Sequence, residues 1–294
     1  MSELTYRIKH RTSYEYSGRI DLCHSLLHLR PCEKKGQNVV EHKIHISPSP
    51  GFQSVRKDYF GNTTQYFSIQ QSHGRLEVTS FVTVTKQEVT PEIPDSRITL
   101  DNEAQLSEMA NGFESGIPLL NFLEPSCACP NIEQLDTFLK PTIISKHEII
   151  EIAHDLMSRI FTDFTYLPGA TQVSTPLIDV LAKKHGVCQD FAHVMIAALR
   201  RIGIPARYVS GYLETVPPPG QEKLQGADAT HAWVEAYTPK TGWVGFDPTN
   251  DQIPGHQHIK ICHGRDYFDV QPLRGVFLGA GSQKLLVEVD VERV

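Results

Sequence analysis

The sequence has no long hydrophobic run and no excess of positive charge. None of its apolar stretches approaches the ~18 consecutive residues that a membrane-spanning helix needs. The first residues, MSELTYRIKHRTSYEY, alternate polar and apolar side chains and lack the basic-then-apolar order of a secretory leader. The formal net charge of −6 is not the excess of positive charge that is typical of proteins that bind nucleic acid or anionic membranes. We therefore expect a cytoplasmic protein that binds neither nucleic acid nor membrane.

Cysteine is present but does not form a metal-binding pattern. Cys127 and Cys129 make a C-x-C pair, whereas zinc ligands are usually spaced by two to four residues with a second pair nearby. No second pair follows, and no carboxylate-rich loop suggests a calcium site. The sequence predicts no metal and no cofactor. In a reducing compartment we expect free thiols at all six cysteines: Cys23, Cys32, Cys127, Cys129, Cys188 and Cys262.

The first 90 residues show a pattern with a period of two. The segments TYRIKHRTSYEY, EHKIHISPSP, TTQYFSIQ and LEVTSFVTVT are β-branched or aromatic runs, separated by the turn signals SPSPG, FGN and SHG. With 294 residues, the chain has room for two domains. Residues 1–90 are therefore predicted to form a β-sandwich-like N-terminal domain.

The period changes after residue 90. Residues 91–144 contain the breaker PEIPDS and two helix candidates, DNEAQLSEMANGF and NIEQLDTFLKPT, and we expect a helical connection there. Ser145 and Glu148 have the spacing of a capping box before a longer helix. Another helix candidate, TPLIDVLAKKHG, precedes three strand candidates, ARYVSGYLE, HAWVEAYT and GWVGFDPT. Residues 145–294 are therefore predicted to be an α+β unit with helices on an antiparallel sheet, including the C-terminal strands.

Cys188 stands at the start of a predicted helix that ends at Gly203. Helix-start N–H groups and the helix dipole favour a thiolate at this position. A buried structural cysteine would show the same periodicity, so this segment alone permits either packing or chemistry. Asp190 is expected to cap the first turn, and His193 is expected at the surface or behind the site. Cys188 lies at the head of an apolar stripe: Phe191, Ala192, Met195, Ile196, Leu199 and Ile202.

His231 and Asp247 lie on two consecutive predicted strands in HAWVEAYTPKTGWVGFD. A hairpin loop with an odd number of residues, centred on Pro239, would place them directly opposite, with Cβ atoms ~5 Å apart. A loop with an even number would send them to opposite faces of the sheet. If the helix of Cys188 packs on the face that carries His231, the thiol, imidazole and carboxylate converge as an activated nucleophile.

Three segments resemble the three motifs of the transglutaminase-like superfamily. They are GVCQDFAHVMIAALRRIGIPARYVSGYL, ATHAWVEAY and WVGFDPTN, which present cysteine, histidine and aspartate in the family's order. Residues 1–90 resemble the β-rich domain that precedes this core in a bacterial subgroup. The segment RDYFDVQPLRGVFLGAGSQKLLVEVDV resembles that subgroup's C-terminal end. The resemblance implies a papain-like core that acts on amide or acyl carbonyls.

Carried over by motif, the resemblance implies that Cys188 is the nucleophile, His231 the general base and acid, and Asp247 the orienting carboxylate. The backbone N–H of Cys188 would contribute to an oxyanion hole. Tyr166, in FTYLPG, is a candidate second donor, with ordinary packing as the alternative. Trp233 is a candidate for lining the substrate cleft, with a core position as the alternative.

The implied chemistry passes through a thioester on a peptide or protein substrate. Resolution by water would make the chain a cysteine protease or amidase, and resolution by a primary amine would make it a transglutaminase. Hydrolysis is favoured because water is abundant and transfer requires a site that excludes it. A non-enzymatic binding or scaffold protein on the same core is the third hypothesis.

The loop ETVPPPGQEKLQGADAT, residues 214–230, is interpreted as a flap or a plain surface loop. The sequence does not predict the oligomeric state.

Overall fold

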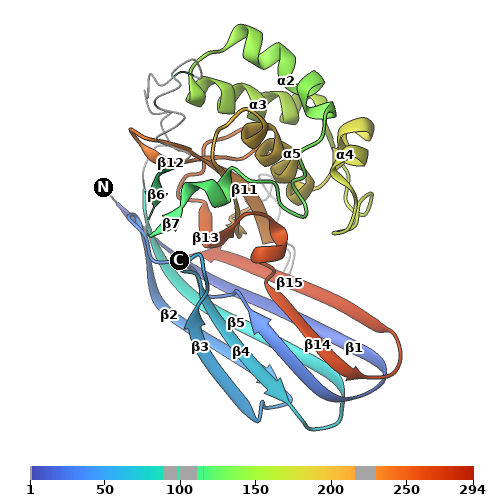
Figure 1. Cartoon of the computed structure of the whole chain (residues 1–294). Helices are drawn as coiled ribbons and strands as arrows, with labels where there is room; N and C mark the ends of the chain where they lie inside the picture. The colour runs from blue at the N-terminus through green and yellow to red at the C-terminus, as the bar shows by residue number, and fades with distance from the viewer. Residues whose placement is uncertain (1, 89–98, 100–110, 115, 216–229) are drawn as a thin grey trace, which may run out of the picture.

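Alternating side chains in the first 87 residues build the lower, all-β half of the molecule (Figure 1). The computed structural model describes residues 2–88, 99, 111–114, 116–215 and 230–294. Most of the predicted flap and most of the helix candidate at residues 101–113 therefore lie outside the described residues. The first five strands of this half are β1 (Glu3–Leu27), β2 (Gln37–Ser47), β3 (Phe52–Lys57), β4 (Thr63–Ile69) and β5 (His73–Gln87).

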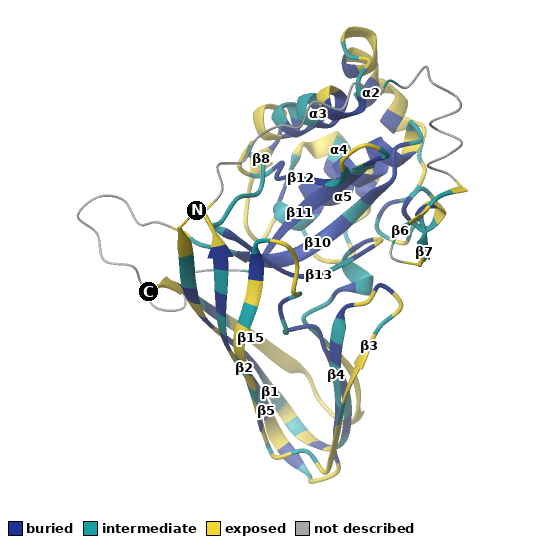
Figure 2. Ribbon diagram, turned by 90° about the vertical axis from the view of Figure 1, so that its left-hand side faces the viewer, coloured by how far each residue is buried: buried dark blue, intermediate teal, exposed yellow. Residues whose placement is uncertain are grey.

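These strands form one sheet in the order β2-β5-β1-β4-β3. Along β1, Glu3–Glu15 and Ile20 pair with β5, whereas Cys23–Leu27 pair with β4. The sheet thereby makes two facing layers, which Figure 2 shows meeting at the bottom of the molecule. Side chains from β1, β2, β4 and β5 fill the space between the layers, as expected for a sandwich-like domain: Ile20, Cys23, Leu27, Leu29, Ile46, Phe67, Ile69, Leu76 and Val78.

The last two strands, β14 (Leu273–Gly279) and β15 (Gln283–Arg293), belong to this N-terminal sheet. Both pair antiparallel with β1, from Leu27 opposite Leu273 to Tyr6 opposite Arg293. The sequence predicted these two strands to be part of the second unit, residues 145–294. They join the first because β1 is long enough to offer its second edge to both strands, and a paired edge satisfies backbone groups that would otherwise stay open.

The upper half is an α+β unit, as predicted. Its sheet is antiparallel, in the order β12 (Gly242–Phe246), β11 (Thr230–Thr238), β10 (Ala206–Leu213), β13 (His258–Gly264). Among the described residues, four helices accompany it: α2 (Gln134–Ser145), α3 (Ile149–Asp163), α4 (Leu177–Lys183) and α5 (Cys188–Arg201). Figure 2 shows α5 and the central strands as the most buried part of this half. Within the described residues, no helix combines the length and apolarity that crossing a membrane requires.

The short elements of this half connect the helices and strands. A small hairpin of β6 (Phe113–Glu114) and β7 (Ile117–Pro118) precedes a 3₁₀ helix at Leu119–Phe122. The parallel pair β8 (Thr165–Tyr166) and β9 (His185–Gly186) brings two loops together beside the start of α5. A second 3₁₀ helix, Tyr267–Asp269, leads into β14.

The predicted capping box at Ser145 is wrong. Ser145 is the last residue of α2, where its hydroxyl donates to the carbonyls of Pro141 and Thr142. Glu148 is instead the N-cap of α3. Helix α2 continues past Pro141, and the hydroxyl of the next residue, Thr142, donates to Asp155 of α3 at 2.6 Å.

Side-chain amides of the N-terminal sheet cover the open edge of β13. The Gln37 amide accepts the Lys260 N–H at 3.0 Å and donates to the Lys260 carbonyl at 2.8 Å. The Asn62 amide makes the same two bonds with His263, at 3.0 and 2.8 Å. Lys86 Nζ donates to the carbonyl of His258 at 2.9 Å. These side chains satisfy edge-strand backbone groups as a further strand would, and so join the two halves.

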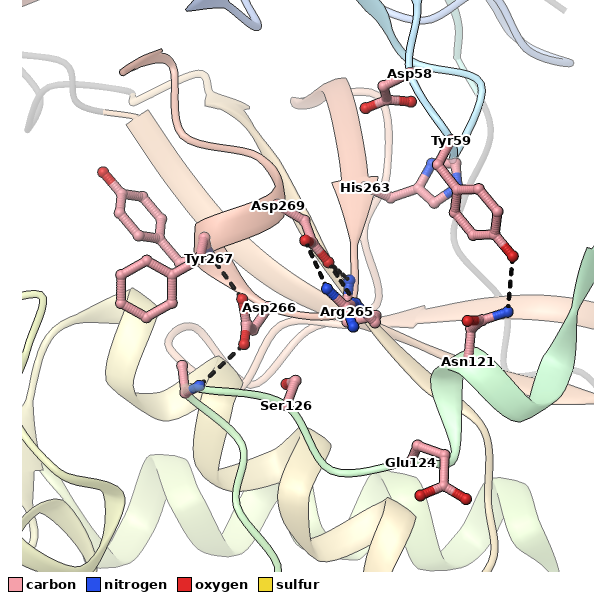
Figure 3. Close-up of polar contacts among 12 residues, drawn as sticks. Asp58, Tyr59, Asn121, Glu124, Ser126, His263, Arg265, Asp266, Tyr267 and Asp269 are labelled. Carbon is pink, nitrogen blue, oxygen red and sulfur yellow. Dashed lines mark hydrogen bonds and ion pairs between the residues drawn. The ribbon is translucent and has the colours of Figure 1, made fainter. Parts of the chain in front are cut away.

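A second contact between the halves lies near the far end of β13. Figure 3 shows the loop of Asp58 and Tyr59 next to His263, with the Asn121 amide pointing at the Tyr59 hydroxyl. That amide donates to the hydroxyl at 3.0 Å. The segment that precedes α2 therefore also contacts the N-terminal sheet.

Candidate active site

The start of α5 is built to present Cys188 as its first residue. Val187 before it is extended, and the Asp190 carboxylate in the first turn accepts the Val187 N–H at 2.8 Å. The Thr171 hydroxyl donates to the same carboxylate oxygen at 2.6 Å. A Cβ at Gly186 would lie only 2.6 Å from that oxygen, so this close approach requires glycine. The predicted capping role of Asp190 is confirmed.

The β11–β12 hairpin brings His231 and Asp247 together in a register that differs from the predicted one. Thr238 pairs with Gly242, so the loop has an odd number of residues, as expected, but is centred on Lys240 rather than Pro239. Asp247, just beyond β12, is consequently diagonal to His231 instead of directly opposite. Diagonal neighbours on one sheet face remain within reach of long side chains. His231 Nε2 lies 2.7 Å from Asp247 Oδ2.

Asp247 is fully buried and serves as an acceptor for several donors. Its Oδ2 lies 2.7 Å from His231 Nε2, 3.0 Å from His258 Nε2 and 2.8 Å from Asn250 Nδ2. Its Oδ1 accepts the Thr249 N–H at 3.0 Å. Burial alone would raise the pKa of Asp247, but the hydrogen bonds from the two imidazoles hold it well below its usual range. The carboxylate is therefore ionised at neutral pH.

His231 connects Asp247 to Cys188. Burial by itself would lower the pKa of His231, but hydrogen bonds with Asp247 and Cys188 raise it to about 10. Since Nε2 faces Asp247, Nδ1 is the ring nitrogen left for Cys188. The imidazole is thus protonated at neutral pH, between a carboxylate and a sulfur. Such a chain of groups can favour a thiolate and can deliver a proton to a leaving group.

The raised pKa of His231 predicts how stability depends on pH. A pKa above its unfolded value adds stability that is fully present below about pH 6.5 and is lost as pH rises towards 10. The difference in free energy of unfolding between wild type and His231→Gln should therefore be largest near pH 6 and shrink by pH 10. Urea denaturation at pH 6, 8 and 10 measures it. A difference that stays constant over this range would contradict the proposed protonation.

The apolar stripe of α5 does not pack on the strand face that carries His231. Its side chains share one core with Ala232, Val234 and Ala236 of β11, whereas His231 alternates to the opposite face. The condition under which the three groups were expected to converge, packing of α5 on the face of His231, is therefore not met. The thiol and the imidazole meet because Cys188 is the first residue of α5 and His231 is the second residue of β11.

Trp233 supports the site from beneath rather than lining a cleft. It is only 1% exposed, so it lacks the open position that contact with substrate would require. Its indole stacks with the His231 ring at 6.1 Å and meets the His258 ring edge-on at 5.3 Å. A Cβ on Gly211 would lie 2.5 Å from the indole, so the ring fits closely over that residue. The core alternative for Trp233 is therefore the one that the structure supports.

Tyr166 lies beside the segment that leads to Cys188. It pairs with Gly186 in the β8–β9 ladder, and its ring meets Phe191 edge-on at 6.3 Å. Partial burial and the nearby Cys188 raise the pKa of the Tyr166 hydroxyl. The side chain is half exposed, which leaves it accessible to a substrate. Its role as an oxyanion donor stays a prediction.

Sequence reasoning missed two residues that contact Asp247. Asn250 ends the FDPTN segment, and its spacing of three residues from the carboxylate could have indicated a local turn contact. His258 belongs to none of the three motifs and meets Asp247 only because β13 lies beside β10 in the sheet. His193, expected at the surface or behind the site, is buried and accepts the Tyr267 N–H at 3.2 Å.

The buried groups around Asp247 also have the donor atoms of a metal site. His231, Asp247 and His258 each offer one ligand atom within 4.8 Å of the others. A ligating histidine must present an unprotonated nitrogen, yet both Nε2 atoms lie at hydrogen-bond distance from an ionised acceptor. This geometry fits hydrogen bonding better than metal ligation, and the predicted absence of a metal stays a prediction.

Comparison with known sequences identifies both halves. The family described as "Transglutaminase-like superfamily" matches residues 137–248, and "Bacterial transglutaminase-like N-terminal region" matches residues 6–85. An uncharacterized protein of Mycobacterium tuberculosis is 38% identical over 296 residues, covering 98% of this chain and 92% of that protein. A protein-glutamine gamma-glutamyltransferase of Pseudomonas aeruginosa is 39% identical over 87 residues, only 29% of this chain and 13% of that enzyme.

Comparison with solved structures identifies the fold. The crystal structure of a candidate cysteine protease from Cytophaga hutchinsonii superposes with a TM-score of 0.75, covering 100% of this chain and 92% of that one. At 19% identity, this likeness concerns the fold alone. The profile matches and the nearly full-length mycobacterial relative show the family. The chain belongs to the transglutaminase-like superfamily and carries the superfamily's bacterial N-terminal region.

Proposed function

We propose that the chain is a cysteine-dependent enzyme that hydrolyses peptide or carboxamide bonds through an acyl-thioester. The observation that carries this proposal is the His231 imidazole, which hydrogen-bonds to the buried Asp247 carboxylate at 2.7 Å and also interacts with Cys188. A buried, ionised carboxylate and a protonated imidazole next to a sulfur make an ion-pair arrangement that activates a thiol.

The proposed reaction has two steps. Cys188 Sγ attacks the substrate carbonyl carbon, and the resulting oxyanion is stabilised by the backbone N–H of Cys188 and by the Tyr166 hydroxyl. His231 gives its proton to the leaving nitrogen as the C–N bond breaks, which releases an amine and leaves a thioester. His231 then takes a proton from water as the water oxygen attacks the thioester. The C–S bond then breaks, which releases the acid product and the Cys188 thiolate, and His231 again holds its proton beside that sulfur.

Asp247 stabilises the charged form of His231 and fixes the orientation of its ring. The 2.7 Å hydrogen bond to Nε2 directs Nδ1 at the thiol. In this proposal Asp247 exchanges no proton, since the contacts that hold its pKa low keep it ionised throughout.

Transfer to a primary amine is the second candidate. It shares the acyl-enzyme step, and the short match to the Pseudomonas gamma-glutamyltransferase favours it. We favour hydrolysis because the half-exposed Tyr166 beside Cys188 indicates that solvent reaches this side of the site. A binding or scaffold role is less favoured because all three reactive groups are retained, with His231 held against the buried Asp247 and interacting with Cys188.

One experiment separates these functions. The protein is incubated with a diverse peptide library and an excess of a primary amine, and the products are compared by mass spectrometry with those of Cys188→Ala. New peptide termini, or glutamine converted to glutamate, that depend on Cys188 would support hydrolysis. Mass gains that match the amine at glutamine would assign transfer instead. Identical products from both proteins would favour the scaffold hypothesis.

We also propose a cytoplasmic location. All six cysteines are free thiols, which suits a reducing compartment. Cell fractionation checks this, and recovery of the protein outside the cytoplasmic fraction would overturn it.

A further inference from the structure

His258 gives the Asp247 carboxylate a second imidazole donor. Its Nε2 lies 3.0 Å from Asp247 Oδ2, and the residue is 3% exposed. Burial lowers the pKa of His258, even though Asp247 acts in the opposite direction. The ring is therefore neutral, with its proton on Nε2 facing the carboxylate. Its Nδ1 has no hydrogen-bond partner within the part of the chain that the structure describes. The only polar contact that this ring makes there is the one with Asp247.

Packing fixes the plane of this imidazole. Trp233 meets the His258 ring edge-on at 5.3 Å and stacks with the His231 ring at 6.1 Å. One indole thus contacts both imidazoles that donate to Asp247. A rotation of either ring would open a gap against a side chain that is 1% exposed.

The N-terminal sheet holds the backbone of His258. Lys86 Nζ donates to the His258 carbonyl at 2.9 Å, and Lys86 is itself 6% exposed. Two residues further on, the Gln37 amide bonds to both backbone groups of Lys260. The end of β13 next to Asp247 is thus held by two side chains of the N-terminal sheet, both buried.

We propose that His258 is a positioning residue, through which the N-terminal sheet keeps Asp247 in the orientation that His231 requires. Three donors converge on Oδ2, and His258 is the one supplied by an element that the N-terminal sheet holds directly. Without it, the carboxylate can turn towards Asn250 and away from His231, which loosens the contact between His231 and Cys188. This inference rests on the proposed function, because Asp247 must act through His231.

The test compares His258→Leu with His258→Gln. Leucine removes the donor and keeps an apolar side chain in the space, whereas the glutamine amide can still donate to Asp247. We expect His258→Leu to lower kcat about 10-fold to 100-fold at unchanged KM, as the loss of a hydrogen bond to a charged group does. His258→Gln should recover most of this loss. Equal rates in wild type and His258→Leu would overturn the proposal.

A second readout needs no substrate. The rate of Cys188 alkylation by iodoacetamide is followed by mass spectrometry from pH 6 to pH 9. His258→Leu should slow the reaction about 10-fold at pH 6 and have little effect at pH 9, where an unassisted thiol is largely ionised. The charged or titratable groups that face His258 are Asp247, His231 and Lys86, and they are unchanged in both variants. Alkylation slowed only in the leucine variant supports positioning, even if no peptide is turned over and the proposed function fails.

One lysine variant and one asparagine variant distinguish a positioning role of His258 from a general loss of stability. Lys86→Met releases the His258 carbonyl and should slow alkylation at pH 6 about threefold, as a weakened hydrogen-bond network does. Asn62→Leu removes the two hydrogen bonds between the Asn62 amide and the backbone of His263, at the other end of β13. It should lower the melting temperature but leave the alkylation rate unchanged. Equal slowing in the two variants would overturn the proposal, and this comparison decides the matter if His258→Leu fails to fold.

Discussion

Replacing Cys188 by alanine is expected to abolish turnover of any peptide substrate, by a factor on the order of 10⁴ or more. The thiol is the only protein group in the proposed mechanism that forms a bond to the substrate carbon. Folding should be nearly unchanged, because Cys188 is partly exposed and the substitution leaves the capping bonds of Asp190 in place. Product formation by mass spectrometry and thermal unfolding measure the two effects.

Cys127→Ala is the matched control for this variant. Cys127 is exposed in a loop, so its loss should leave both activity and stability as in wild type. Full activity in Cys188→Ala would show that another group carries out the reaction. Equal losses in both variants would indicate that the preparation, and not the thiol, limits the assay.

Replacing Asp247 by asparagine should lower kcat by roughly 10³-fold to 10⁴-fold and leave measurable residual activity. Carboxylate oxygens accept from donors on both sides here, Thr249 N–H at Oδ1 and His231 at Oδ2. An asparagine NH₂ group faces a donor in either orientation. The imidazolium also loses its negative partner, so both the charge and the direction of His231 are affected.

The same substitution should destabilise the fold by about 1–3 kcal/mol, because a buried donor is left facing another donor. Urea denaturation measures this loss, and kinetics at saturating substrate measure the effect on kcat. Asp251→Asn, at an exposed position four residues later, is the control and should change neither. Unchanged kinetics in Asp247→Asn would mean that the contact with His231 has no catalytic role.

The period-two pattern of the first 90 residues was sufficient to predict the β-sandwich-like domain, and the change to a helical period predicted the helices on an antiparallel sheet. Periodicity reports which residues of one segment share a face, and it correctly placed Cys188 at the head of the α5 stripe. It does not report which strands pair over long distances. For that reason β14 and β15 were assigned to the wrong unit, although their pairing with β1 is extensive.

Predictions that considered only neighbouring residues were wrong at two positions, the capping box at Ser145 and the centre of the hairpin loop. Ser145 has the spacing of an N-cap, but it is the last residue of α2, where its hydroxyl donates to the carbonyls of Pro141 and Thr142. The hairpin loop had the predicted parity, but Lys240 rather than Pro239 is its centre, which moved Asp247 by two positions relative to His231. The two side chains are long enough to reach each other from diagonal positions, so the predicted contact between His231 and Asp247 still forms.

The residues that surround the site were the least predictable part. The sequence allows Trp233 to be either a cleft or a core residue, because strand alternation does not predict whether solvent or other protein residues lie against a given face of the sheet. His258 has no motif around it, and its contact with Asp247 depends on the pairing of β13 with β10 and on the clamp by Gln37 and Lys86. Both facts are properties of the assembled sheet rather than of any segment.

The most direct test of the account is the alkylation of Cys188 at pH 6 under limiting iodoacetamide. Cys127 is exposed and Cys32 is partly exposed, so these two free thiols compete with Cys188 for the reagent in one sample. The account predicts selective labelling of Cys188, and a loss of this selectivity of about tenfold in His231→Gln, because an unassisted thiol is mostly protonated at pH 6. Slow, equal labelling of every exposed thiol, unchanged by His231→Gln, would contradict the claim that His231 and Asp247 activate this sulfur.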